Sequence, residues 1–324
     1  MKTCDRCSKN SVILVRYSGA HLCKRHFTEF FERRVRHELR RQVDLRMDER
    51  FAMAVSGGKD STVMMFILKR ILSPRRDTEF CAITVDEGIE GYRDSAIPMV
   101  AENCKILDIE HVVVSFNELH GFTMDDVVEA ERNMSACSYC GVMRRAALNR
   151  AARDWRATRL ATGLNLDDTA QSVLMNFSRG DVGRLARLGP HRRLQPNLVP
   201  RIQPMRTIPE NEVVLYALIN EIPYHDLECP YASEALRNDY RAVVSRLEDK
   251  YPGTRHSILN SHEKILESLE KTTPPAKLRR CECGEPTVGD RCKVCELVAS
   301  ISEKRATPEN RRGTTRRSSD TRSP

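Results

Sequence analysis

The hydrophobic positions in the central part of the chain alternate between short apolar runs and longer stretches with helical spacing. The short runs predict strands, and stretches in which apolar residues recur every three or four positions predict helices. We expect strands at 51–55, 80–85, 111–116 and 159–162. We expect helices at 62–72, 95–107, 143–154, 167–177 and 212–221. Strands that alternate with helices in this way favour an α/β fold, with a parallel sheet covered by helices on both faces.

The segments on either side of this block differ from it in composition. Residues 28–50 predict a highly charged helix, and residues 237–270 predict a further helical region. Residues 181–210 carry five prolines and predict an irregular loop. A loop of that length inside a compact domain usually has a function or is disordered. From about residue 303 the chain has almost no apolar residues, so we expect a disordered basic tail.

The charge distribution indicates which partners the chain can bind. The 324 residues carry a net charge of +8, which is compatible with a polyanionic partner. One arginine cluster has acidic residues mixed into it, which is typical of a solvated helix face: Arg33, Arg34, Arg36, Arg40, Arg41, Arg46 and Arg50. A second cluster has only Asp181 as a nearby counter-charge and is the better candidate for contacting phosphates: Arg179, Arg184, Arg187, Arg192, Arg193, Arg201 and Arg206.

No apolar run approaches the roughly 20 residues that a membrane-spanning helix needs. The first residues also lack the apolar core of a signal peptide. We therefore expect a cytoplasmic protein without a membrane partner.

The chain has twelve cysteines, and in a cytoplasmic protein of this size metal or redox chemistry explains them better than disulfides. At the N-terminus, Cys4 and Cys7 precede Cys23 and His26 with the pair spacing of a structural zinc site. Near the C-terminus, a second zinc module is expected from Cys281, Cys283, Cys292 and Cys295. Its first pair has a single intervening residue, so His256 and His262 are alternative ligands. Cys81 and Cys104 are expected in the core.

Three cysteines remain in the central block. Cys137 and Cys140 form a Cys-x-x-Cys pair just before a predicted helix, and Cys229 stands alone in a predicted loop. Three thiolates can hold a [4Fe–4S] cluster with one iron left open. The same residues also suit a persulfide relay, in which one cysteine carries sulfur and another resolves it.

The first predicted strand leads directly into a glycine-bearing hexapeptide, Ser56-Gly57-Gly58-Lys59-Asp60-Ser61, and a helix follows. A strand, a tight turn and a helix in this order point backbone N–H groups and the positive end of the helix at an anion. The spacing differs from the Walker pattern, which has four residues between its first glycine and Gly-Lys-Ser/Thr. The hexapeptide therefore predicts a phosphate-binding loop of another kind.

The hexapeptide resembles the PP-loop of the N-type ATP pyrophosphatases, which cleave ATP between the α- and β-phosphates and adenylate a carbonyl oxygen. Residues 86–88 (Asp-Glu-Gly) and 161–168 resemble two further nucleotide motifs of that superfamily. The resemblance implies a PP-loop α/β fold that binds ATP and Mg²⁺. The nucleotide-binding residues that it implies are Ala54, Ser56, Gly57, Gly58, Lys59, Asp60, Ser61, Val85, Asp86, Arg144, Gly163 and Asp168.

A PP-loop followed by Cys137, Cys140 and Cys229 resembles the tRNA 2-thiolation enzymes. Zinc modules at both ends are similar to the branch that takes sulfur from a ubiquitin-like carrier protein. The resemblance implies that these cysteines hold a [4Fe–4S] cluster, and that the enzyme thiolates C2 of a tRNA uridine as a homodimer. The catalytic residues would be the three cysteines with Lys59, Asp60, Arg144 and Asp168. Uridine 34 and uridine 54 both stay open as the target.

These interpretations divide the chain into four regions. They are an N-terminal zinc finger (1–27), the PP-loop catalytic domain (28–275), a C-terminal zinc ribbon (276–300) and the basic tail (301–324). Another PP-loop enzyme, such as an amidotransferase or a tRNA-base ligase, has no need of the three central cysteines. A non-catalytic zinc-ribbon scaffold that binds RNA leaves the hexapeptide unexplained.

Overall fold

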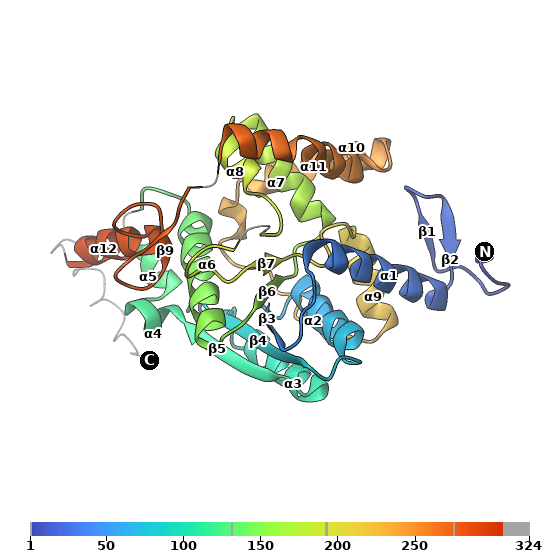
Figure 1. Ribbon diagram of the computed structural model, residues 1–324, viewed down its shortest axis with the longest axis horizontal. Helices are drawn as coiled ribbons and strands as arrows, with labels where there is room; N and C mark the ends of the chain where they lie inside the picture. The colour runs from blue at the N-terminus through green and yellow to red at the C-terminus, as the bar shows by residue number, and fades with distance from the viewer. Residues whose placement is uncertain (1, 131, 192–193, 275, 307–324) are drawn as a thin grey trace, which may run out of the picture.

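Five parallel strands form the centre of the protein, and their carboxyl ends meet at one edge of the sheet (Figure 1). The computed structural model describes residues 2–130, 132–191, 194–274 and 276–306. The strand order is β5-β4-β3-β6-β7. The strands are β3 (Glu49–Ala54), β4 (Thr78–Asp86), β5 (Glu110–Ser115), β6 (Arg159–Thr162) and β7 (Arg201–Ile202). Ala54 lies beside Ile83 on one side and Thr162 on the other, so the segments after β3, β4 and β6 converge.

Helices cover both faces of the sheet because the central strand is apolar on both faces. Phe51 and Met53 face one apolar cluster, and Ala52 between them faces another. The first face is covered by α1 (Lys24–Gln42), α2 (Lys59–Leu72), α3 (Ala96–Leu107) and α9 (Glu210–Ile219). The second is covered by α6 (Ala136–Asp154), with α4 (Phe116–His120) and α5 (Met124–Glu129) beside it.

A further group of helices packs together next to this sandwich. It contains α7 (Leu166–Ser178), α8 (Val182–Ala186), α10 (Arg237–Lys250) and α11 (Thr254–Thr272). A short 3-10 helix, η1 (Ala232–Glu234), precedes α10. The α/β prediction is confirmed, and the predicted central strands agree with β3 to β6 to within a few residues.

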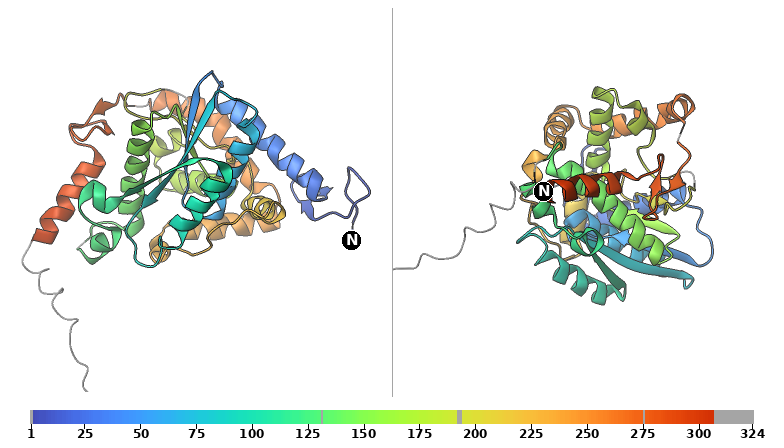
Figure 2. Two further views of the ribbon diagram at one scale, coloured as in Figure 1. Left: turned by 90° about the horizontal axis from the view of Figure 1, so that it is seen from below. Right: turned by 90° about the vertical axis from the view of Figure 1, so that its left-hand side faces the viewer.

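Small modules lie at the two ends of the molecule (Figures 1 and 2). The N-terminal module is a hairpin of β1 (Ile13–Val15) and β2 (Ala20–Leu22), which leads directly into α1. The C-terminal module has β8 (Arg279–Arg280), β9 (Pro286–Thr287) and α12 (Lys293–Ala306). Among the described helices, none combines the length and apolarity that crossing a bilayer would require.

Helix α1 differs from the charged helix predicted at 28–50. It begins at Lys24 and ends at Gln42, so it crosses the proposed domain boundary after residue 27. Its buried stripe of Phe27, Phe31, Val35 and Leu39 follows helical spacing. Just before β3 begins, Asp48 has a left-handed backbone with φ of 56°. The end of the helix was missed because charged residues continue past the last apolar contact.

Two other predictions are wrong in part. The loop predicted at 181–210 contains α8 and the edge strand β7, which are too short to show a hydrophobic period. The helical region at 237–270 is two helices separated at Gly253, whose φ is 99°. The predicted tail lies outside the described residues from 307 onward. Residues 301–306 complete α12, with Ile301 buried.

The packing of α1 on α9 gives a test of the core. Phe31 is fully buried and stacks on Tyr216, with 4.3 Å between the ring centroids. We expect Phe31→Ala to lower the free energy of unfolding by about 3–5 kcal/mol, because it leaves a cavity. Urea denaturation, monitored by the fluorescence of the single tryptophan, Trp155, measures this free energy of unfolding. Phe177 is 68% exposed, and Phe177→Ala should change the value by less than about 0.5 kcal/mol. Equal losses of unfolding free energy in the two variants would contradict the placement of Phe31 in the core.

Candidate active site

The hexapeptide predicted to bind phosphate forms the turn between β3 and α2. Gly57 has a φ of +87°, a conformation that favours glycine, and Gly58 is the N-cap of α2. The Ser61 hydroxyl accepts from the Ser56 amide at 3.0 Å and donates to the Gly58 carbonyl at 3.0 Å. Gly58 has no side chain with which to cap the helix. The amides of the first turn of α2 are therefore available to an anion.

The loop after β6 packs against this turn. A Cβ added to Gly163 would lie 2.8 Å from both the backbone nitrogen and Cα of Ser61, so only glycine permits this approach. Two residues later, Asn165 caps α7 and donates to the Asp60 carboxylate at 3.0 Å. The N-termini of α2 and α7 therefore meet at the carboxyl ends of the strands.

Charged side chains surround the meeting point of the two helices. Lys59 Nζ lies 2.6 Å from Glu210 Oε1 and 3.1 Å from Asp60 Oδ2. Burial raises the pKa of Asp60 and of Asp168, and the Arg237 guanidinium, 3.3 Å from Asp168, works against this for Asp168. Carboxylate oxygens are the ligands that Mg²⁺ takes beside a nucleotide, so Asp60 and Asp168 fit that role. Glu210 and Arg237 were not predicted, because their partners are remote in sequence.

The end of β4 contributes a buried ion pair on the opposite side of the turn. Val85 is buried, and the Asp86 carboxylate accepts from the Gly88 amide at 2.8 Å. Glu87 is 1% exposed and accepts two hydrogen bonds from Arg93, at 2.6 and 2.8 Å. Arg93 also donates to the Ser56 carbonyl at 2.7 Å. Sequence reasoning missed the roles of Glu87 and Arg93, and Arg93 has no motif that could have marked it.

Cys137, Cys140 and Cys229 lie near one another beside this edge, close enough for their charges to interact, but among the described residues only the two terminal ligand sets have all their ligand atoms within 4.8 Å. Helix α6 begins at Ala136, so Cys137 and Cys140 lie within its first five residues. The prediction that they precede the helix is wrong. Cys229 follows α9 in a loop that is tied to the PP-loop, because the His225 amide donates to the Gly57 carbonyl at 2.9 Å.

Further contacts hold the Cys229 loop against the start of α6. The Cys137 Sγ lies 3.4 Å from the Tyr231 carbonyl oxygen. The Glu234 carboxylate accepts from the Ala136 amide at 2.9 Å. Both Cys140 and Cys229 pack against the apolar cluster that contains Tyr139 and Met143. The first turn of α6 and the Cys229 loop therefore form one surface.

Burial and neighbouring negative charges at this surface disfavour free thiolates. Burial raises the pKa of Cys140 to about 11, with smaller increases from Glu87, Cys229 and Cys137, against the opposing charge of Arg144. Burial and the nearby Cys229 also raise the pKa of Cys137. Thiols in such a group become thiolates when a metal neutralises them, so the donor set fits an iron–sulfur cluster.

Arg144 occupies the position between the cysteines and the nucleotide motifs. Its guanidinium lies 3.5 Å from Glu87 Oε1, and its charge lowers the pKa of Cys140. Its side chain is 44% exposed. That Arg144 faces the nucleotide stays a prediction.

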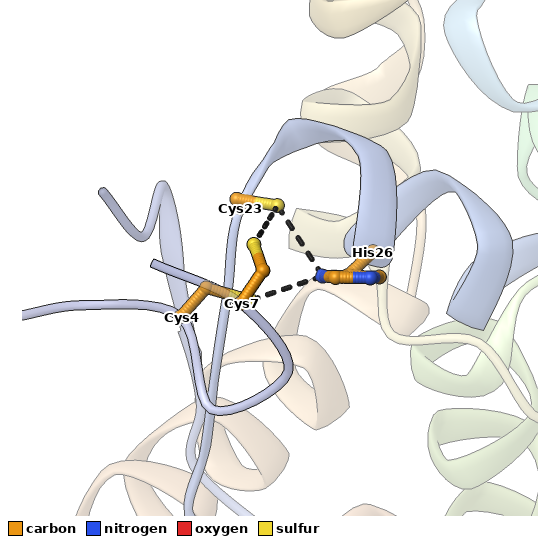
Figure 3. A group of neighbouring side chains, drawn as sticks. All are labelled: Cys4, Cys7, Cys23 and His26. Atoms are coloured by element: carbon orange, nitrogen blue, oxygen red, sulfur yellow. Dashed lines mark hydrogen bonds between the residues drawn. The ribbon is translucent and has the colours of Figure 1, made fainter. Parts of the chain in front are cut away.

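The N-terminal ligand set is assembled from the loop before β1, which carries Cys4 and Cys7, and from the start of α1, with Cys23 at its N-cap and His26 in its first turn (Figure 3). His26 Nδ1 lies 3.2 Å from Cys4 Sγ and 3.5 Å from Cys23 Sγ, and Cys7 Sγ lies 3.7 Å from Cys23 Sγ. Burial acts to raise the pKa of Cys4, but hydrogen bonds from Arg6, Cys23 and His26 lower it to about 6. Three sulfurs and one imidazole nitrogen in this arrangement fit a tetrahedral zinc ion.

The C-terminal ligand set is complete with four cysteines. Within the described residues, the ligand atoms of Cys281, Cys283, Cys292 and Cys295 all lie within 4.8 Å of one another. The single-residue spacing of the first pair therefore does not prevent four-fold ligation. His262 instead bonds the Leu185 carbonyl, and His256 lies against Tyr17, so the two histidines are not substitute ligands.

The C-terminal module docks on the helix that carries Cys137 and Cys140. Its Val294 packs against Val142 and Ala146 of α6. Arg153 of the same helix donates to the Gly284 carbonyl at 2.9 Å. The module therefore braces α6 from the side.

The second arginine cluster is not uniformly exposed. Arg206 is 4% exposed and pairs with Glu263 at 2.8 Å and with Glu38 at 3.9 Å, so it is part of the interior. Arg184 pairs with Asp181 at 3.2 Å. Arg192 and Arg193 lie outside the described residues. The expectation that this whole segment contacts phosphates is therefore wrong for Arg206.

Comparison with known proteins places these features in one family. The model of the PP-loop domain family matches residues 25–247, and the model of the 2-thiouridine synthetase TtuA N-terminal LIM domain matches residues 3–28. The chain is 41% identical over 316 residues to the tRNA 2-thiolation protein NcsA of Haloferax volcanii, covering 92% of this chain and 98% of that protein. It is 33% identical over 295 residues to the tRNA-5-methyluridine(54) 2-sulfurtransferase of Pyrococcus horikoshii, covering 91% and 93%.

A solved structure is similar over the same range. The U34-tRNA thiolase NcsA from Methanococcus maripaludis, solved with its [4Fe–4S] cluster, superimposes with a TM-score of 0.82 at 37% identity. The match covers 93% of this chain and 96% of that one.

The contact between Gly163 and Ser61 gives a test of the nucleotide site. We expect Gly163→Ala to weaken ATP binding by about tenfold or more, since the added methyl group must displace backbone of the phosphate loop and overpacking costs about 1–3 kcal/mol. Titration calorimetry with ATP measures this. The control is Gly289→Ala, because a Cβ there meets no atom within 4 Å. ATP affinity equal to wild type in Gly163→Ala would show that the nucleotide binds elsewhere.

The two ligand sets give a test of metal content. We expect about two zinc ions per chain, because structural sites with such ligands bind one ion each. Cys7→Ser and Cys283→Ser should each remove about one zinc, as measured by elemental analysis, whereas Cys104→Ala should retain both. Loss of zinc from His262→Ala but not from Cys283→Ser would contradict the C-terminal site.

Proposed function

Because the chain belongs to the PP-loop family of tRNA 2-thiolation proteins, we propose that it is an ATP-dependent tRNA uridine 2-sulfurtransferase. The observation that carries this proposal is the position of Cys229. The loop that carries Cys229 is bonded to the phosphate loop through His225 and Gly57, and it packs against the first turn of α6 with Cys137 and Cys140. A site for activating a carbonyl oxygen and a site for handling sulfur are therefore adjacent.

The phosphate loop activates the uridine in the first half of the proposed reaction. ATP lies with its phosphates over residues 56–61, where the amides of α2 and the Lys59 ammonium stabilise negative charge. Ala54, Val85, Asp86 and Gly163 border the nucleotide, and Asp60 and Asp168 supply oxygen ligands for Mg²⁺. The uridine is turned out of its loop, as enzymes that act on bases require. Its C2 oxygen attacks the α-phosphorus, a P–O bond forms, and pyrophosphate leaves.

The second half exchanges the activated oxygen for sulfur. Sulfide forms a bond to C2, the C2–O bond breaks, and AMP leaves with the former C2 oxygen. When bound by three protein thiolates, a [4Fe–4S] cluster supplies one iron with a position open to sulfide. Cys137, Cys140 and Cys229 are the residues that would hold it. Arg144 is placed between these cysteines and the nucleotide, where its charge favours the adenylate.

Other assignments follow from the family and are proposals of the same kind. A ubiquitin-like carrier protein delivers the sulfur, the enzyme works as a homodimer, and it acts in the cytoplasm. Position 34 and position 54 of tRNA both stay open, since relatives of both kinds match the chain.

A persulfide relay is the second candidate. It uses the same three cysteines without a cluster: Cys229 carries the sulfur, and attack by Cys137 or Cys140 on its persulfide forms a disulfide and releases sulfide. A PP-loop ligase of another kind leaves the convergence of the three thiols without a purpose.

An anaerobic preparation tests the proposal. We expect about four iron atoms per chain, with absorbance near 400 nm, as for a [4Fe–4S] cluster. Cys229→Ala should lose this iron because only two thiolates remain, whereas Cys81→Ala, a change in the core, should retain it. Wild type supplied with sulfide, ATP and tRNA should produce 2-thiouridine, AMP and pyrophosphate, measured by nucleoside mass spectrometry and phosphate release.

The outcomes separate the two candidates. Thiolation by a protein that contains neither iron nor labile sulfide would favour the persulfide relay over the cluster mechanism. Iron incorporation and ATP binding without thiolation of any tRNA uridine would overturn the proposed function.

A further inference from the structure

Helix α1 carries a strongly basic groove that has no place in the reaction described above. The groove has a volume of about 770 Å³ and runs between the helix and Thr207. Its helix side is lined by Arg33, Arg34, His37, Glu38, Arg40 and Arg41. Every lining residue is polar, and four arginines face one carboxylate. Surfaces that bind proteins usually have apolar side chains at their centre, and no apolar side chain lines this groove.

The spacing of the basic residues follows from the packing of the helix. Phe27, Phe31, Val35 and Leu39 are buried and turn one side of α1 to the core. Arg33, His37 and Arg40 are exposed and recur at intervals of four and three positions, so they share another side of the helix. From Arg33 to Arg40 this row extends about 10 Å along the helix axis. The groove is therefore a linear array of positive side chains.

Two of the four arginines are already neutralised by interior carboxylates. Arg34 lies 2.6 Å from Glu212, and it also donates to the Thr207 carbonyl. Arg41 lies 3.3 Å from Glu38 and 3.1 Å from Glu263. These pairs hold the walls of the groove in place and use the one carboxylate that lines it.

The positive charges of the other two arginines are not neutralised by a carboxylate. Across the described ranges, neither Arg33 nor Arg40 has a carboxylate oxygen within 4.0 Å. Arg33 lies 5.8 Å from the centre of the Phe30 ring, and Arg40 donates through Nε to the Arg36 carbonyl. Both guanidinium groups therefore face the groove without a neutralising partner, which is the condition for binding an external anion.

The two walls of the groove are connected along the chain to the N-terminal ligand set and to the active site. His26, a member of that set, is on the same helix seven residues before Arg33. On the other side, Thr207 precedes Glu210 by three residues, and Glu210 pairs with Lys59 of the phosphate loop at 2.6 Å. The short segment 207–210 therefore links the wall of the groove to a residue that contacts the phosphate loop.

We propose that this groove binds the sugar–phosphate backbone of the tRNA, with Arg33 and Arg40 each contacting a phosphate. The inference rests on the proposed function for the identity of the RNA. Backbone contacts of this kind position a nucleic acid without reading its sequence. They would hold the body of the tRNA while the target uridine enters the site at the edge of the sheet.

The test compares tRNA binding by wild type and by Arg33→Gln/Arg40→Gln over a series of salt concentrations. An unmodified tRNA transcript is the probe. Loss of two phosphate contacts should reduce the slope of log affinity against log salt by about 1.5, and should weaken binding about tenfold at low salt. ATP affinity measured without tRNA should equal that of wild type, because neither residue touches the phosphate loop.

A matched variant controls for the change in net charge. Arg76 and Arg156 are exposed near the amino ends of β4 and β6, at the edge of the sheet opposite the phosphate loop. Arg76→Gln/Arg156→Gln removes the same charge, and it should keep the affinity and salt slope of wild type. Thermal unfolding of both variants confirms that they are folded.

The outcomes distinguish this proposal from the function on which it rests. Equal affinity and equal salt slope in wild type and the Arg33/Arg40 variant would overturn the proposal that the groove binds tRNA, even if the protein thiolates tRNA. Normal tRNA binding with loss of thiolation only when a protein sulfur donor is used would assign the groove to an acidic protein, and would also overturn it. Binding of tRNA that depends on the groove, in a protein that thiolates no tRNA, would support the groove and overturn the proposed function alone.

Discussion

The backbone of the turn between β3 and α2 is the constraint on which the rest of the site depends. Its carbonyl groups are satisfied by distant elements: Arg93 donates to Ser56, and the His225 amide donates to Gly57. The loop at Gly163 packs so closely against Ser61 that a single methyl group would not fit. Because buried backbone groups must find partners, each of these contacts fixes another element relative to the turn. The end of β4, the start of α7 and the Cys229 loop are all positioned in this way.

A second link joins the nucleotide side of the site to the cysteine side through Glu87. This buried carboxylate accepts two hydrogen bonds from Arg93 and lies 3.5 Å from Arg144, which in turn acts on the thiol of Cys140. A charge buried to this extent needs such partners, because leaving it unpaired is strongly unfavourable. The C-terminal module adds support by packing on α6, the helix that carries Cys137 and Cys140. In the proposed reaction, activation of the base and delivery of sulfur would share one rigid frame.

The sequence by itself determined the features that depend on local spacing. The order of strands and helices follows from the period of the apolar residues, and the phosphate loop follows from two glycines at the end of a strand. Both terminal ligand sets follow from short intervals between cysteines, and the structure gathers each set within 4.8 Å. The starts of α1 and α6 were misplaced because metal ligands and cysteines occupy the first residues of these helices, where no apolar period marks the start of a helix.

Only the tertiary structure decided which charges are neutralised. From spacing alone, the arginines of α1 indicate a solvated face and those of 179–206 a surface for phosphates. Folding instead buries Arg206 between Glu38 and Glu263, and leaves Arg33 and Arg40 in an open groove. The same holds for Glu210, Arg93 and the edge strand β7, whose partners lie far away along the chain. Electrostatic pairing depends on distance in space, and local sequence carries no record of distances between segments that meet only when the chain folds.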